Sequence, residues 1–220
     1  MNAVKRTLFG AAMIVAVFSA GAAIAAPADV ITVGTRIGVP GTTVDVPVYI
    51  RDTSGTPLGI DQPPGSRIQS YSIKVDYSPA SAVQSITFTR AGITQSLTPT
   101  FENSPSGPGT VSLIDTFNES TSLIPFTSNA ALPGNQIGVL HVTLAAAGVV
   151  GTPVTLTLDP TLTQLTDQGG SPATKETVNA GNLTLVNGSI ALVADIPAMS
   201  HWMLVLFVAA LGVIALRLRM

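Results

Sequence analysis

The sequence predicts an all-β fold, a single antiparallel sandwich of about nine strands. Short stretches of alternating polar and apolar residues run from Asp29 onward, and residues rich in Gly, Pro, Ser and Thr separate them. This period of two is the pattern of half-buried strands. No segment between the two ends of the chain has the apolar stripe of an amphipathic helix. These three observations favour a sandwich over a helical or mixed fold.

The predicted strands follow one another through the middle of the chain. The clearest alternation lies in residues 43–50 and 70–77, where four apolar side chains share one face of each stretch. Pro-Gly, Asn-Gly and Gly-Thr-Pro sequences between the stretches are turn formers. The full set of expected strands is 29–39, 43–50, 70–77, 81–88, 109–117, 136–146, 152–159, 181–186 and 188–194.

Composition bounds the classes of function. Charged residues make up 10% of the 220-residue chain, far below the roughly 25% of an average soluble domain. The span 26–195 holds all twelve carboxylates but only six lysine or arginine residues, a net charge of −6. An acidic surface without a basic stripe argues against nucleic acid as a partner. The chain has no cysteine, which excludes disulfides and thiol nucleophiles.

The N-terminal 25 residues have the plan of a signal peptide. Lys5 and Arg6 form a basic start, residues 8–22 are apolar, and Ala23 and Ala25 are the small residues expected before a cleavage site. We expect this signal helix to direct export and signal peptidase to cut after Ala25. An uncleaved anchor helix is the alternative.

The C-terminal end carries a second apolar run, residues 203–216. As a helix this run would span about 21 Å, short of the roughly 30 Å of a bilayer's hydrocarbon core. A helix that begins near Pro197 would nearly close the gap. Trp202 suits the headgroup region, and Arg217 and Arg219 would remain in the cytoplasm as a basic membrane stop. The sequence therefore predicts a membrane-inserted hydrophobic helix with its N-terminal side outside.

The order of a short motif, an apolar helix and a basic end resembles the PEP-CTERM-like sorting tags of Gram-negative bacteria. The most similar variant is the IPTL-CTERM tag, whose motif reads Ile-Pro-Thr-Leu-Ser-x-Trp. The residues that match it are Ile196, Pro197, Ser200 and Trp202. The residues that depart from it are Ala198, Met199 and Met203. The resemblance implies processing by an exosortase, a membrane-embedded transpeptidase-like enzyme, and a removable tail would leave the mature protein without a membrane span. A plain membrane anchor is the alternative.

Four stretches of the middle resemble cohesin domains, in the order in which cohesins have them. Residues 33–50 resemble the opening, where a Pro-Gly turn leads into a Val-x-Val-Pro-Val strand, and residues 68–87 resemble the next segment, with its Tyr-Ser-Pro strand end. Residues 137–158 look like the central strand pair, and residues 186–193 like the closing strand. The resemblance implies a nine-stranded jelly roll, related to some carbohydrate-binding modules.

Cohesins bind dockerins, which are calcium-loaded helical modules, on one flat sheet face. The resemblance therefore implies a protein partner held by a sheet face. Residues 51–69 form a longer connection than cohesins usually have there, and we expect this connection to reshape that face. A flat face of Thr, Ser and Leu would favour a protein partner, and a shallow groove lined by tyrosines would favour a glycan.

The middle of the chain shows no catalytic constellation. Its one histidine, His141, is expected on the solvent-facing side of a strand, together with Val139 and Thr143. No Ser-His-Asp order or phosphate loop is visible, so we predict a non-catalytic protein without a cofactor. A structural calcium site at Asp159 and Asp167 stays open beside a solvated loop, because calcium prefers oxygen ligands.

The sequence as a whole predicts three segments: a signal peptide at 1–25, a cohesin-like sandwich at 26–195 and a sorting tag at 196–220. We expect a precursor in the inner membrane that is then delivered to the cell envelope, the cell surface or the extracellular matrix. The expected partner is an unknown surface protein. The alternative is a carbohydrate-binding module attached to exopolysaccharide, and an envelope hydrolase ranks below both. Tyr71 and Tyr77 are expected in the core, which weakens glycan binding.

Overall fold

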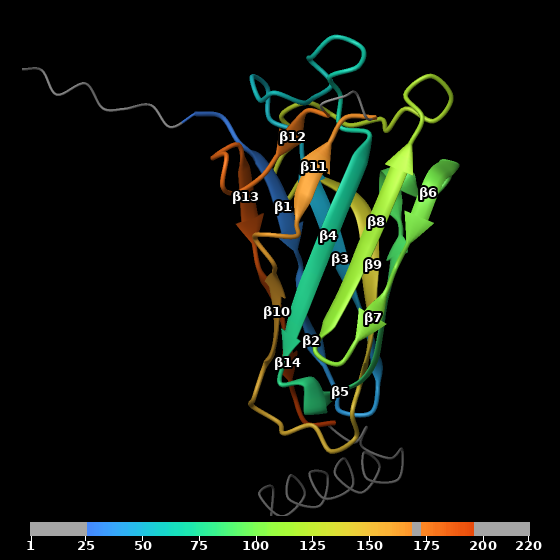
Figure 1. Ribbon diagram of the computed structural model, residues 1–220. Coiled ribbons are helices and arrows are strands. Elements are labelled where there is room, and N and C mark those ends of the chain that lie inside the picture. Colours follow the sequence, from blue (N-terminus) through green and yellow to red (C-terminus); the bar gives the residue numbers. More distant parts are fainter. Residues whose placement is uncertain (1–25, 169–172, 196–220) are drawn as a thin grey trace, which may run out of the picture.

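The computed structural model describes residues 26–168 and 173–195, and the signal and sorting segments expected at the two ends lie outside them. In the described part, strands make up nearly all regular structure, and they form two sheets that face each other as a sandwich (Figure 1). Two short 3-10 turns, η1 (Ala80–Ala82) and η2 (Gly92–Thr94), lie in connections. The predicted all-β sandwich is confirmed.

The smaller sheet has five strands in the order β13-β1-β3-β9-β5. Their bounds are Leu183–Val186 for β13, Asp29–Val33 for β1, Thr43–Arg51 for β3, Asn135–Leu144 for β9 and Val83–Arg90 for β5. β3, which contains the clear alternation of residues 43–50, lies with β9 at the centre of this sheet, where each of the two strands is paired on both sides.

The larger sheet has nine strands built around β4 (Ser70–Ser78). One edge of β4 pairs with β8, which in turn pairs with β6 and β7, and the other edge pairs with β10 and β11. The remaining bounds are Thr110–Phe117 for β8, Pro99–Asn103 for β6, Ser106–Gly107 for β7, Val154–Leu158 for β10, Gln164–Thr166 for β11, Lys175–Glu176 for β12, Gly188–Leu192 for β14 and Thr35–Gly38 for β2.

The first predicted strand, residues 29–39, is two strands in different sheets. The chain leaves the smaller sheet after β1, passes Gly34 and enters the larger sheet as β2. The last part of the chain makes the same change of sheet between β13 and β14, and a Cβ on Gly188 would lie 2.2 Å from the carbonyl oxygen of Gly34. The two chain segments therefore lie side by side, in parallel, at a point where neither carries a side chain.

Two pairings in the described sheets depart from the antiparallel expectation. β1 pairs with β13, and β14 pairs with β2, in parallel. Both pairs join the first part of the chain, β1 and β2, to its last part, β13 and β14. The two parts run in the same direction on both sides of the change of sheet. All other described pairings are antiparallel, so the two parallel pairs close an otherwise antiparallel sandwich.

The core lies between the sheets and is formed by the inward side chains of both. Tyr71, Phe88 and Phe117 are its largest fully buried side chains. Buried and less buried residues alternate along the central strands, so that β4 and β8 bury every second residue. Tyr71 lies in the core as predicted, whereas Tyr77 is half-buried and packs against the edge of the core.

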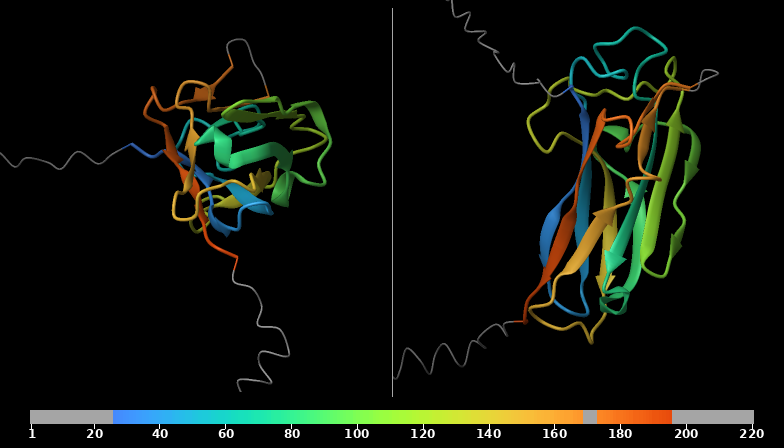
Figure 2. Two further views of the ribbon diagram at one scale, coloured as in Figure 1. Left: turned by 90° about the horizontal axis from the view of Figure 1, so that it is seen from below. Right: turned by 60° about the vertical axis from the view of Figure 1, so that its left-hand side comes forward.

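The two ends of the sandwich differ in charge. At the acidic end, loops 52–69 and 118–134 cover the sheets, and Asp29 and Glu176 lie beneath them. At the neutral end, the connections 39–42, 79–82, 108–109 and 145–153 contain no charged residue. The described chain begins at the acidic end and finishes at the neutral end (Figures 1 and 2).

Candidate binding face

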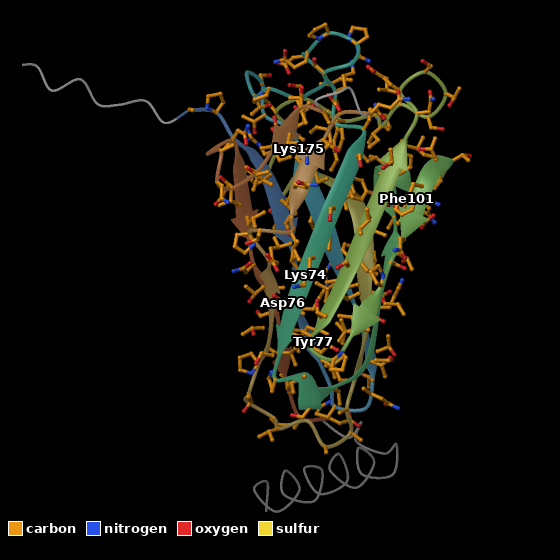
Figure 3. All side chains as sticks on the ribbon, viewed as in Figure 1. Lys74, Asp76, Tyr77, Phe101 and Lys175 are labelled. Atoms are coloured by element: carbon orange, nitrogen blue, oxygen red, sulfur yellow. The ribbon has the colours of Figure 1, made fainter. Side chains whose placement is uncertain are left out.

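The outward face of the larger sheet consists mainly of small hydroxyl side chains. We call it the hydroxyl face, and it lies toward the viewer in Figure 3. Inward neighbours of these residues, such as Ile73 and Leu113, are fully buried, so alternation turns the hydroxyl side chains outward. The face comprises Ser70, Ser72, Lys74 and Asp76 of β4, Ser112, Ile114 and Thr116 of β8, Thr155 and Thr157 of β10, and Gln164 and Thr166 of β11.

Hydrogen bonds hold several of these hydroxyl groups in place. Ser70 Oγ lies 2.9 Å from Thr116 Oγ1 on the neighbouring strand. Ser72 Oγ donates to the carbonyl oxygen of Leu162, and Thr155 Oγ1 donates to that of Ser78. Because short side chains with formed hydrogen bonds have little rotamer entropy to lose, this surface is already ordered for contact with a rigid partner.

Lys74 lies on the central strand of the hydroxyl face, between two carboxylates. Its Nζ lies 2.9 Å from Asp159 Oδ2 and 3.4 Å from Asp76 Oδ1. The hydrogen bond to Asp159 raises the pKa of Lys74, and the same bond lowers the pKa of Asp159. The face therefore presents a partly neutralised charge cluster near its centre, rather than an isolated lysine.

Phe101 on β6 adds an apolar contact at one border of the hydroxyl face (Figure 3). It pairs in register with Thr116, whose side chain points outward, and 53% of Phe101 is exposed. Leu162, in the loop beside Ser72, is 52% exposed. Exposed aromatic side chains are frequent anchors in protein interfaces. Polar residues with an apolar anchor beside them are the composition of a binding surface rather than of a catalytic cleft.

A buried polar network fixes the strands beneath the face. The Tyr71 hydroxyl donates to Asp115 Oδ2 at 2.7 Å, and burial raises the pKa of Asp115 to about 6. Arg90 from the smaller sheet pairs with Glu102 of β6 at 3.1 Å, and its guanidinium lies 6.0 Å from the centre of the Phe117 ring. The network ties β6, β8 and β4 to the opposite sheet, which keeps Phe101 in a fixed position.

His141 lies on the outer face of the smaller sheet, on the side shared with Val139 and Thr143, as predicted. Its Nδ1 lies 2.6 Å from Asp45 Oδ1, and its Nε2 lies 2.9 Å from Thr89 Oγ1. Sequence reasoning missed this Asp-His-Thr order, because it depends on the register of β3, β9 and β5.

The Asp-His-Thr order lacks the enclosure that nucleophilic catalysis uses. The side chains of His141 and Asp45 are 40% and 67% exposed on an open sheet. Electrostatic stabilisation of an oxyanion depends on a water-excluded site, and exposed groups on an open surface do not supply one. The arrangement acts as a cross-strand polar contact between three strands.

The acidic end buries carboxyl groups that the sequence did not single out. Asp29, Asp52 and Glu176 have no exposed surface. One oxygen of each group accepts a hydrogen bond from a backbone N–H of the loop above. Thr53 donates to Asp29, Ile60 to Asp52 and Leu58 to Glu176. The other oxygen of each group accepts no such bond. Loop 52–69 therefore uses these carboxylates as attachment points.

Burial changes the protonation of these groups. Burial, and after it the neighbouring carboxyl group of Glu176, raise the pKa of Asp29 from its usual 3.8 to about 9. Burial also raises the pKa of Glu176 and of Asp52. At neutral pH Asp29 is therefore protonated beside Glu176, because two charged carboxylates cannot share a desolvated site.

The two residues considered for calcium, Asp159 and Asp167, each bond to other groups of the protein. Asp159 accepts the Lys74 ammonium and the backbone N–H groups of Thr161 and Leu162, while Asp167 accepts the N–H of Thr174. Across the described residues, no group of three His, Cys, Asp or Glu side chains is arranged to hold a metal ion. For Asp159 a solvated loop fits better than a calcium site, since the ammonium group of Lys74 already pairs with its carboxylate.

The expected effect of residues 51–69 on the binding face stays a prediction. Loop 52–69 lies over the acidic end, where Leu58 is fully buried and donates its N–H to Glu176. The glycan alternative predicted a groove lined by tyrosines. Tyr77 lines a shallow groove with Val83 and Pro108, but its hydroxyl donates to the carbonyl of Gly107, and no second tyrosine lines that groove.

The remaining predicted site residues lie outside the described residues. They are Ala23 and Ala25 of the cleavage site, Ile196, Pro197, Ser200 and Trp202 of the sorting motif, and Arg217 and Arg219 of the basic end. Within the described part, no helix is long and apolar enough to cross a membrane.

No family model matches the sequence, and the comparison with curated proteins gives no significant match. Solved structures do match. The third cohesin ScaC of Acetivibrio cellulolyticus, determined in complex with the ScaB dockerin, has a TM-score of 0.53 at 16% identity, over 76% of this chain and 99% of that one. The chain has a cohesin-like fold. The resemblance noted in its sequence is thereby confirmed at the level of the fold.

Two further cohesins give the same result. The seventh ScaB type I cohesin of Pseudobacteroides cellulosolvens has a TM-score of 0.53 at 15% identity, over 79% of this chain and 97% of that one. CaCohA2 of Clostridium acetobutylicum has a TM-score of 0.52 at 19% identity, over 78% of this chain and 94% of that one. At these identities the likeness concerns the arrangement of strands and leaves function to be argued from the face.

Proposed function

We propose that the chain is an exported, non-catalytic binding protein of the cell envelope, which holds a protein partner on its hydroxyl face. The observation that carries the proposal is the face itself: ordered hydroxyl groups around Lys74, with exposed Phe101 at the border. Such a surface suits a preformed protein partner, because little side-chain entropy is lost on contact.

The similar structures support a protein as the partner. The ScaC cohesin of Acetivibrio cellulolyticus was determined bound to a dockerin, and a cohesin of Clostridium thermocellum, OlpA, was determined in a complex with Doc918. We propose a partner of the same general kind, a protein module that docks on a sheet, for this chain.

Export and sorting are part of the same proposal. The basic start and apolar stretch of residues 1–25 support cleavage by signal peptidase. The motif, apolar run and arginines of residues 196–220 support insertion in the inner membrane and processing by an exosortase-type enzyme. A binding domain delivered in this way would work at the cell surface or in the extracellular matrix.

Site-specific crosslinking tests the binding face. A photo-crosslinking phenylalanine analogue replaces Phe101 in the full chain, which is expressed in a Gram-negative bacterium. The same analogue at Thr87 is the control. Thr87 is exposed on the outer face of the smaller sheet, so it samples the opposite side. We expect a discrete protein adduct from position 101 and none from position 87.

The products of the crosslinking distinguish the alternatives. An adduct that is lost when calcium is chelated would indicate a calcium-loaded partner module. A polysaccharide adduct at position 101 would favour the carbohydrate-binding alternative. Protein adducts that form equally at both positions would contradict a specific role for the hydroxyl face. Intact mass of the envelope protein tests the sorting part, since a species that still ends at Met220 would contradict removal of the tail.

A further inference from the structure

The neutral end of the sandwich is formed by connections that pack together. The backbone N–H of Gly41 donates to Leu144 O, that of Ala145 to Ala82 O, and that of Gly151 to Leu192 O. A small apolar pocket between them is lined by Pro79, Ala82, Val149, Leu192 and their neighbours. These contacts make the end of the sandwich one continuous surface rather than a set of separate loops.

Apolar side chains at the neutral end are exposed. Val149 and Val150, at the tip of connection 145–153, are 66% and 51% exposed, and Ile37 of β2 is 70% exposed. Val193 is 37% exposed beside them, and its N–H donates to the carbonyl of Gly38. The charged residues that flank these connections in the sequence, Arg36, Asp45, Asp76 and Asp195, belong to strands or to the final described residues and not to the connections themselves. An exposed apolar tip without charges is the composition of a surface that contacts something apolar.

The chain leaves the sandwich at this same end. After Val193 only two residues precede the motif that begins at Ile196, and the apolar run 203–216 follows it. If a membrane helix begins near Pro197, as the thickness of the hydrocarbon core requires, the linker is too short to hold the sandwich away from the bilayer. The neutral end then faces the membrane surface.

We propose that the neutral end is a lipid-contact surface, in which Val149 and Val150 rest in the interfacial layer of the outer leaflet while residues 203–216 span the bilayer. The inference rests on the membrane insertion proposed above. Two valines are too few to anchor a protein, so their contact orients the domain and does not replace the helix.

The orientation has a consequence for the binding face. The strands of the larger sheet lie along the axis that joins the neutral end to the acidic end (Figure 1). With the neutral end on the bilayer, the hydroxyl face stands roughly along the membrane normal and the acidic end lies farthest from the lipid. The carboxylates at Asp52, Asp61 and Glu119 are thereby kept away from anionic headgroups, which would repel them.

Environment-sensitive labelling of the full chain tests the contact. The chain has no cysteine, so Val150→Cys gives a single labelling site for the fluorophore NBD. Leu132→Cys is the matched control, because Leu132 is 72% exposed in loop 118–134 at the acidic end. Both variants are synthesised in the presence of phosphatidylethanolamine–phosphatidylglycerol vesicles with headgroup-quencher lipids, and flotation reports membrane association separately.

We expect both variants to float with the vesicles. NBD at position 150 should show a blue-shifted emission and strong quenching by the lipids, and NBD at position 132 should behave as in water. If the chain floats with the vesicles but NBD at both positions emits as in water, the lipid contact is overturned and the membrane insertion stands. A chain that does not float would overturn the insertion and the contact together. Neither of these results bears on the hydroxyl face, which the crosslinking tests independently.

Discussion

The acidic and neutral ends close the same two sheets in opposite ways. At the acidic end, loop 52–69 packs down on the sandwich and attaches to buried carboxyl groups, with Leu58 and Thr56 out of contact with water. At the neutral end, connection 145–153 is bonded to its neighbours only through backbone groups, and Val149 and Val150 at its tip remain exposed. The difference teaches that one end is built for internal stability and the other retains an apolar surface for an external contact.

The largest expected difference between the ends concerns glycine. Gly134, at the acidic end, has φ +110°, and a Cβ there would lie 2.5 Å from the carbonyl oxygen of Ile50. Gly134→Ala should lower the free energy of unfolding by about 3 kcal/mol or more. Gly151, at the neutral end, has φ +87° with nothing within 4 Å of a Cβ, so Gly151→Ala should cost only about 1 kcal/mol.

Urea denaturation of residues 26–195, followed by circular dichroism, measures both changes. This span contains every strand of the two sheets. Equal losses for the two alanine variants would show that the acidic loops are no more tightly packed than the neutral ones.

The second effect is a pH dependence that comes from the acidic end. In the folded chain Asp29 keeps its proton up to a pH of about 9, whereas in the unfolded chain it ionises near 3.8. Its contribution to stability is therefore full below a pH of about 4 and is lost as the pH rises toward 9. Between pH 5 and pH 9 the free energy of unfolding should fall by more than about 1.4 kcal/mol, the equivalent of one pKa unit.

Asp29→Asn removes the titrating group and keeps the shape of the side chain. The variant should show a flatter dependence of the unfolding midpoint on pH over the same range. A slope equal to that of the unchanged chain would mean that Asp29 is ionised in the folded state.

The third effect concerns threonine hydroxyls in the two ends. Thr56 is buried, and its Oγ1 lies 2.6 Å from the carbonyl oxygen of Leu58. Thr56→Val leaves that carbonyl without its partner and should cost about 1–2 kcal/mol. Thr42 makes a similar bond to Val39 at the neutral end but is exposed, so Thr42→Val should change stability by less than about 0.5 kcal/mol. Thermal melts of both variants compare them directly, and a larger loss for Thr42→Val would reverse the comparison.

The smallest expected effect belongs to the exposed valines. Val149→Ser and Val150→Ser remove apolar groups that already face solvent, so in the absence of membranes each should alter the free energy of unfolding by less than about 0.5 kcal/mol. Urea denaturation of residues 26–195 checks this. A loss above 1 kcal/mol would place the valines in the folded core and remove the reason to seek an external contact for them.

Strand positions were predictable where alternation is long. The bounds of β3, β4, β8 and β9 agree with the predicted stretches to within two residues, because each strand buries one face over many residues. β6, β7, β11 and β12 were not predicted. They have between two and five residues and form only by pairing with the edges of β4, β8 or each other, so their own sequences carry little pattern.

In the candidate sites, too, the features set by local alternation were predictable, and the contacts between distant strands were not. The outward position of His141 followed from strand alternation, but its contacts with Asp45 and Thr89 depend on the register of three strands. Asp29 and Glu176 were not singled out from the sequence, since no pattern near either residue indicates its burial. They meet only because the first and last parts of the chain lie side by side.

The sequence by itself determined that this protein is an all-β sandwich with cohesin-like strand patterns, since alternation and turn residues are local properties of the chain. It also carries the predicted export and sorting segments, 1–25 and 196–220. Only the tertiary structure decided which strands share a sheet, where the chain changes sheets at Gly34 and Gly188, and which side chains form the hydroxyl face. The physical reason is that pairing register, desolvation of Asp29 and the separation of an acidic end from a neutral one arise from contacts between distant parts of the chain.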